Sequence, residues 1–152
     1  DLNDSLNQHM QRYTTHLNQL YKEERSLWET DYSPSTIRWV ADDPEQSILS
    51  FIRQGTRKKD FLVVVVNLVP TERLNFKVGV PYEGEYQEIL NTEMVDFGGT
   101  WEKGNGVQST IEEEFKDFTY QIKINVPALG ILYFKPMNKT TRNSTVKGGK
   151  EL

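Results

Sequence analysis

The first thirty residues carry apolar side chains at the spacing of one face of an α-helix. Successive apolar residues are mostly three or four positions apart, which matches a period of about 3.6 residues. They are Leu2, Leu6, Met10, Tyr13, Leu17, Leu20, Tyr21, Leu27 and Trp28. Asn3, Asp4 and Ser5 offer N-cap oxygens, and Ser33-Pro34 cannot continue a helix. The pattern predicts a long amphipathic helix over residues 3–30.

After Pro34 the hydrophobic period changes to two, which is typical of β-strands. We predict strands at residues 37–40, 47–53, 61–66, 74–80, 86–90, 120–126 and 129–134. The unbroken apolar run Phe61–Val66 indicates a central strand that is covered on both faces. A turn is expected at 42–45, a basic hairpin loop at 55–60 and less regular structure at 91–118. Short strands with frequent turn signals predict an antiparallel β-sandwich, so the fold class is mainly β.

These elements divide the chain into three parts. A helical segment at 1–33 precedes an all-β sandwich at 34–136, and a polar, basic tail at 137–152 is expected to be flexible. A sandwich buries its own core, so a helix with a wide apolar face needs a further surface to cover it. We therefore expect an apolar stripe on this helix to be an association surface, through which the isolated chain associates with itself. The stripe consists of Leu6, Met10, Tyr13, Leu17 and Leu20.

Composition and charge exclude several classes of protein. The 152 residues suffice for one ordinary domain, and the absence of cysteine rules out disulfides, thiolate metal sites and a cysteine nucleophile. Residues 31–134 carry a net charge of −6, so the globular part is a poor match for nucleic acid. The sequence has neither an apolar run of about 18 residues nor a signal peptide. We expect a cytoplasmic protein with no nucleic-acid or membrane partner. Because the sequence begins with Asp1 and not Met, we expect that it is processed or trimmed.

The residues that usually carry catalysis are sparse. His9 and His16 lie two helical turns apart, about 10 Å, and are interpreted as exposed helix histidines that hold no metal. A glycosidase needs two carboxylates that converge on a sugar, whereas Asp42-Asp43 and Glu112–Glu114 are adjacent residues in expected solvated turns. Gly98-Gly99 lacks the Lys-Ser/Thr of a phosphate loop and is interpreted as a turn. We predict no catalytic residue, no metal ligand and no cofactor.

Exposed aromatic rings are the remaining candidates for binding. A flat ring flanked by polar groups can form a platform for a sugar, and Trp101 in the Gly-rich loop is the first candidate. Tyr82 is the second glucan-binding candidate, and Tyr86 follows. The alternative is that these rings pack against the sandwich. The pattern alone leaves both interpretations open.

Three stretches carry a more specific signal. Residues 20–53, 65–105 and 126–136 resemble the C-terminal end of bacterial 1,4-α-glucan (glycogen) branching enzymes, which belong to the α-amylase-like glycoside hydrolases. The closest motif matches are Leu27-Trp28-Glu29-x-Asp31, Asp42-Asp43, Ser47–Arg53, Gly79-Val80-Pro81 and Glu88–Thr92. The chain departs from the family pattern at Asn67–Pro70 and in a longer loop at Thr100–Lys103. The resemblance covers about residues 17–136, and the Glu-Ile-Leu-Asn-Thr stretch is its most specific part.

The resemblance implies a role for the helix. In this family a (β/α)₈ barrel precedes an amylase-type C-terminal sandwich, so residues 3–30 would be the last helical segment of the catalytic barrel. That barrel, absent from this chain, would be the first partner, and α-glucan or glycogen the second. The parent enzyme would cleave an α-1,4 bond and transfer the segment to a 6-hydroxyl. No family catalytic motif matches a position here, so the resemblance implies an inactive, structural chain with a secondary glucan contact.

Two alternatives stay open at this point. The chain could be an autonomous carbohydrate-binding sandwich, which requires an exposed aromatic platform. It could also be the C-terminal domain of an amylase or a debranching hydrolase, since these share the barrel and the sandwich. The Glu-Ile-Leu-Asn-Thr stretch at residues 88–92 favours a branching enzyme.

Overall fold

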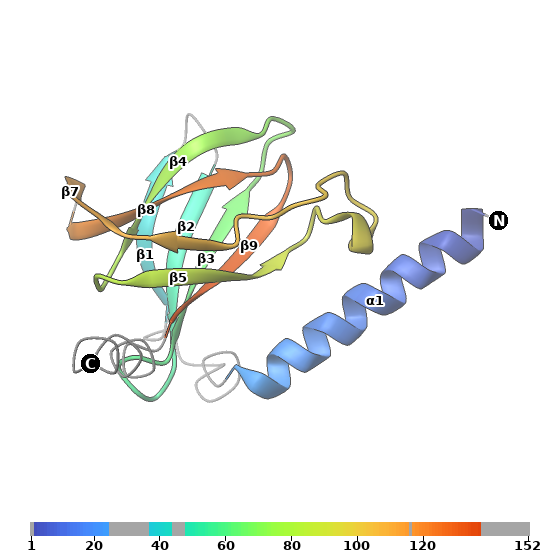
Figure 1. The fold of residues 1–152 in the computed structure, drawn as a ribbon, viewed down its shortest axis with the longest axis horizontal. Helices are drawn as coiled ribbons and strands as arrows, with labels where there is room; N and C mark the ends of the chain where they lie inside the picture. The colour runs from blue at the N-terminus through green and yellow to red at the C-terminus, as the bar shows by residue number, and fades with distance from the viewer. Residues whose placement is uncertain (1, 25–36, 44–47, 116, 138–152) are drawn as a thin grey trace, which may run out of the picture.

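The computed structural model describes residues 2–24, 37–43, 48–115 and 117–137 (Figure 1). Helix α1 (Leu2–Glu23) comes first, and a short 3₁₀ helix, η3 (Val95–Phe97), interrupts the strands that follow. The strands are β1 (Ile37–Asp43), β2 (Ile48–Gln54), β3 (Phe61–Asn67), β4 (Arg73–Val80), β5 (Glu85–Asn91), β6 (Val107–Ser109), β7 (Ile111–Phe115), β8 (Phe118–Val126) and β9 (Ile131–Pro136). Trp28 lies outside the described residues.

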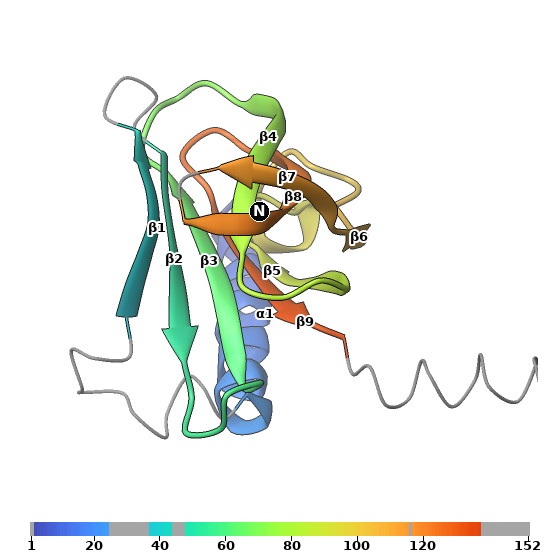
Figure 2. The ribbon, with the colours of Figure 1, turned by 90° about the vertical axis from the view of Figure 1, so that its left-hand side faces the viewer.

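The strands form two sheets, and every pairing between them is antiparallel. The larger sheet has the order β1-β2-β3-β9-β5-β6, and the smaller one has the order β4-β8-β7. Figure 2 shows the two sheets facing each other. Strand β3 is central in its sheet, since Val64 lies opposite Phe51 of β2 and opposite Tyr133 of β9. The predicted β-sandwich and its central strand are confirmed.

The core fills the space between the two sheets. Alternate residues of each strand face the same side, so the period of two places one apolar set in the interior. The buried core cluster consists of Ile48, Ile52, Phe61, Val63, Val65, Val78, Val80, Tyr86, Phe118, Ile122, Ile124, Val126, Leu132 and Phe134. On β3 the intervening residues Leu62 and Val64 are buried too, as the unbroken apolar run predicts for a strand covered on both faces.

Three details differ from the prediction, and a fourth lies partly outside the described residues. Helix α1 is described from Leu2 to Glu23, and the last part of the predicted helix, residues 25–30, lies outside the described residues. Asp42 and Asp43 are not in a turn but at the end of β1, paired with Leu49 and Ile48.

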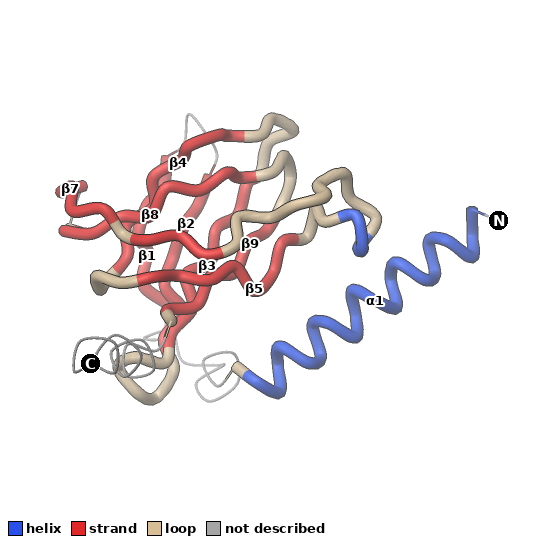
Figure 3. Tube along the Cα trace, in the orientation of Figure 1, coloured by secondary structure: helices blue, strands red, loops and turns tan. Residues whose placement is uncertain are grey.

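Residues 91–118 contain more regular structure than the sequence pattern indicates: η3, β6 and β7 all lie there (Figure 3). The last strand begins at Ile131, because Leu129 adopts a left-handed turn conformation with φ of 52°. Over the described residues, no helix is long and apolar enough to cross a membrane.

Candidate functional site

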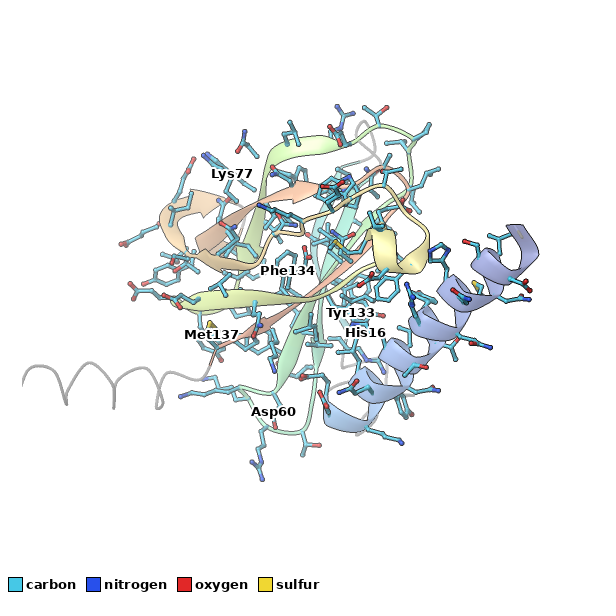
Figure 4. The ribbon with its side chains drawn as sticks, turned by 45° about the vertical axis from the view of Figure 1, so that its right-hand side comes forward. His16, Asp60, Lys77, Tyr133, Phe134 and Met137 are labelled. Atoms are coloured by element: carbon cyan, nitrogen blue, oxygen red, sulfur yellow. The ribbon has the colours of Figure 1, made fainter. Side chains whose placement is uncertain are left out.

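Helix α1 contacts the sandwich through Phe97 of η3 and through β5. The Phe97 ring lies 5.4 Å from the Tyr13 ring in an edge-to-face arrangement, and 5.4 Å from the His16 ring. The His16 Nε2–H donates a hydrogen bond to the backbone carbonyl of Ile89 on β5, at 2.8 Å. Burial, and then the neighbouring Tyr13, raise the pKa of Tyr133 on β9. Helix α1 therefore lies close to both β5 and β9, and Figure 4 shows His16 on this helix and Tyr133 on the sandwich.

The loop that presents Phe97 is held by its own backbone. The amide of Trp101 donates to the carbonyl of Glu93, and the amide of Val95 donates to the carbonyl of Trp101, both at 2.9 Å. Gly98 ends η3 in the left-handed region with φ of 91°, which favours glycine. A side chain on Gly99 would collide with the carbonyl of Glu93. This part of the chain therefore requires small residues where the sequence has Gly98-Gly99.

A half-buried carboxylate fastens the far end of the same loop. Glu88 Oε2 accepts hydrogen bonds from the backbone and side-chain amides of Asn105, at 3.1 and 2.7 Å. Asn105 also bonds to the backbone of Asn125 on β8 through its Nδ2 and Oδ1. Burial raises the pKa of Glu88, and its bonds to Asn105 act in the opposite direction. The sequence pattern does not reveal this cluster, because Glu88 and Asn105 lie 17 residues apart along the chain and meet only in the folded structure.

The apolar stripe of α1 is divided between two surroundings. Its inner edge faces the sandwich: Leu20 is 5% exposed, and Tyr13 and Leu17 are half-buried. Its outer face consists of Leu6, Met10 and Tyr21, which are 60%, 61% and 49% exposed. The prediction of one five-residue association surface is therefore wrong in its extent, because the sandwich itself covers part of the stripe.

The histidines have a different role from the one expected. Both are half-buried, and a Cβ on Gly98 would lie 3.7 Å from His9. The interpretation of His16 as an exposed helix histidine is wrong, since it packs on Phe97 and bonds to β5. Within the described ranges, no three His, Asp or Glu side chains are grouped so that they could hold a metal ion.

The acidic run 112–114 lies on β7 and not in a turn. Its three side chains are exposed, as expected, and Glu113 forms an ion pair with Lys77 of β4 at 2.7 Å. Neighbouring residues of a strand point to opposite faces, so this run does not converge on one substrate bond. The arrangement offers no acid and nucleophile pair at this place.

A cavity of about 530 Å³ lies beside the sugar-platform candidate Tyr82. It opens between the β2–β3 loop, the β4–β5 turn and the end of β9. Arg57, Lys58, Lys59, Asp60, Phe61, Tyr82, Glu83, Gly84, Glu85, Tyr86, Pro136 and Met137 line it. Tyr86 is only 1% exposed and belongs to the core, so it cannot serve as a platform.

Trp101 lies elsewhere. It is half-buried in the loop that carries η3, where it forms an isolated bridge with Met94. It does not line the cavity beside Tyr82, so the structure keeps the two glucan-binding candidates apart.

The comparison with family models agrees with this architecture. Residues 39–137 match the model of the alpha amylase C-terminal all-beta domain, which is more than half of the chain. The chain belongs to this family. The two-sheet sandwich with α1 before it is thus an amylase-type C-terminal domain, as the resemblance implied.

Similar proteins are branching enzymes by name. A 1,4-alpha-glucan branching enzyme of Lactiplantibacillus plantarum is 41% identical over 138 residues, which are 90% of this chain and 22% of the relative. One of Clostridium perfringens is 44% identical over 82% of this chain and 19% of the relative. One of Halothermothrix orenii is 33% identical over 91% and 22%. The chain spans about a fifth of the length of these curated relatives, and the matched part is their C-terminal domain.

Removing the Phe97 ring tests the docking of α1. We expect Phe97→Ala to lower the free energy needed to detach α1 from the sandwich by about 1–2 kcal/mol, because the helix loses its edge-to-face contact. Amide hydrogen exchange should accelerate in α1 and stay slow in β3. The matched control is Val95→Ala, on the same turn but 45% exposed. Unchanged exchange in the Phe97→Ala helix would contradict this account of docking.

The pKa of Glu88 predicts a pH dependence. Because burial raises this pKa in the folded chain, the folded state favours the protonated carboxyl. The contribution of Glu88 to stability is therefore greatest below the ordinary carboxyl pKa of the unfolded chain, and it declines as pH rises toward the folded pKa. Urea unfolding at about pH 4 and pH 7 should show Glu88→Gln gaining stability relative to the parent chain at the higher pH. An equal difference at both pH values would contradict the raised pKa.

Proposed function

We propose that this chain is the structural C-terminal domain of a cytoplasmic 1,4-α-glucan branching enzyme. The parent enzyme would cleave an α-1,4 bond and transfer the released segment to a 6-hydroxyl, which creates an α-1,6 branch. Three relatives with this printed name, aligned over most of the chain, support the proposal. They favour a branching enzyme over an amylase or a debranching hydrolase. The lack of cysteine supports the cytoplasmic location.

The observation that carries the structural role is the outer face of α1. Leu6, Met10 and Tyr21 recur at steps of four and eleven residues, so they share one side of the helix. Helix α1 already contacts the sandwich through Tyr13, His16 and Leu20, while the side chains of this outer face stay about half exposed or more. A catalytic (β/α)₈ barrel packed on this face would be joined to the sandwich through one shared helix. In this proposal residues 1–33 belong to the barrel and 34–136 to the sandwich.

The proposed chemistry lies in the barrel. Barrel enzymes of this kind place their catalytic groups on the loops after the barrel strands, and such loops are not part of this sandwich. The reading frame upstream of Asp1 should therefore encode a (β/α)₈ barrel with the carboxylate pair of a retaining enzyme. An upstream sequence without a barrel would contradict the proposed parent.

The isolated chain should associate through the outer face. In sedimentation equilibrium we expect a mass above that of the monomer, since about half of each side chain of this face is in contact with water. The double variant Leu6→Gln/Met10→Gln should shift the chain toward monomer. Leu74→Gln is the matched control, because Leu74 is 60% exposed on β4, as Leu6 is on α1. A monomer at all concentrations, or an equal effect of the control, would contradict the role of this face.

The isolated chain should also leave amylose unbranched. The absorbance maximum of the amylose–iodine complex is expected to stay constant after incubation with the chain. The branching enzyme of Lactiplantibacillus plantarum, tested in parallel, serves as the positive control and should shift the maximum. A shift produced by the chain alone would place the chemistry in these 152 residues and overturn the structural role.

A further inference from the structure

We propose that the cavity beside Tyr82 binds a linear α-1,4-linked glucan chain, and that Tyr82 is the ring on which a glucose unit stacks. The identity of the sugar rests on the proposed function. The site itself follows from the packing of the ring, the charges of the lining and the size of the cavity. Its volume of about 530 Å³ is that of an ordinary ligand pocket.

The backbone of Tyr82 is held by Tyr86, and its ring packs on the ring of Phe61. The hydroxyl of Tyr86 donates to the carbonyl of Tyr82 at 2.8 Å and accepts from the amide of Tyr82 at 3.4 Å. Burial raises the pKa of Tyr86, so its hydroxyl keeps the proton that this bond requires. The ring of Phe61 lies 5.9 Å from the Tyr82 ring and supports it from the core. A ring fixed in this way loses little conformational entropy when a ligand stacks on it.

One side of the ring is accessible to a ligand. The Nζ atom of Lys58 lies 5.8 Å from the centre of the Tyr82 ring, within the range of a cation–π contact. Lys58 is exposed in the β2–β3 loop, and its flexible side chain can give way to a sugar ring. Its ammonium would then be a hydrogen-bond donor to the sugar hydroxyls.

The charges of the lining favour a neutral ligand. Three cationic side chains and three carboxylates surround the cavity, so their formal charges cancel. They are Arg57, Lys58 and Lys59, and Asp60, Glu83 and Glu85. A phosphate or a nucleotide would meet carboxylates, whereas hydroxyl groups can donate to the carboxylates and accept from the cations. This lining therefore matches a polyhydroxyl ligand better than an anion.

A second, smaller cavity borders the first, and the pair is called the groove below. A second space of about 170 Å³ shares Lys59, Asp60, Phe61 and Pro136 with the first. It ends where Lys135 forms an ion pair with Glu24, at 3.3 Å, just beyond the end of α1. Figure 4 shows Asp60 and Met137 at this same end of the sandwich.

The groove lies apart from the outer face of α1. Its lining contains only Glu23 and Glu24 from the end of the helical segment, and none of Leu6, Met10 or Tyr21. A barrel on the outer face would therefore not need to cover the groove. In the proposed enzyme the groove would hold a glucan chain away from the catalytic centre.

Affinity electrophoresis of the whole chain in glycogen-containing gels tests the site. We expect the parent chain to be retarded by glycogen, and titration with maltoheptaose to give binding that cellohexaose does not. Tyr82→Ala should raise the dissociation constant about tenfold or more. Trp101→Ala, the other sugar-platform candidate, is the matched control and should bind like the parent. Near-UV circular dichroism establishes that both variants are folded.

A second variant keeps the test independent of any effect of Tyr82→Ala on folding. Lys58→Ala changes only an exposed side chain, and we expect weaker binding of maltoheptaose with an unchanged melting temperature. Three results would each overturn the proposal: a parent chain that is not retarded, a folded Tyr82→Ala that binds like the parent, or loss of binding in Trp101→Ala. An upstream barrel found together with an unretarded chain would overturn this site alone and leave the proposed function intact.

Discussion

The contact of Phe97 with Tyr13 and His16 is the interaction on which the placement of α1 depends. A sandwich can bury its core without any helix, and an isolated helix of this length is marginal in water. Phe97 joins the two, and the hydrogen bond from His16 to Ile89 fixes the helix against β5. With Leu20 covered and Tyr13 packed on Phe97, the outer face of the same helix (Leu6, Met10 and Tyr21) remains exposed.

Most of the sandwich could be predicted from the sequence because burial and strand period act on the same residues. On β8 the alternation of apolar and polar residues indicates a strand with one buried face. On β3 the continuous apolar run indicates a strand that is buried on both faces. Strands β6 and β7 escaped prediction since Val107–Ser109 has only three residues and is held by pairing with β5, not by its own pattern. Such pairing is a property of the tertiary structure.

The candidate site was predictable only in part. The apolar stripe of α1 is visible in the sequence. Which of its residues contact the sandwich depends on Phe97, which lies far from them along the chain. The sequence ranked Trp101 ahead of Tyr82 as a sugar platform, and the structure places the two residues in different surroundings. Trp101 is bonded through its backbone to Glu93 within a loop, whereas Tyr82 borders a cavity. Neither the backbone bonds nor the cavity leaves a signal in the local sequence.

The central claim is that one helix is fixed to the sandwich by its inner edge and leaves its outer face exposed. Nuclear Overhauser effects between aromatic protons measure this directly in the isolated chain. The account predicts strong effects from the Phe97 ring to the rings of Tyr13 and His16, and none from the sandwich to Met10. A helix without effects to Phe97, or one whose Met10 methyl contacts the sandwich, would contradict it.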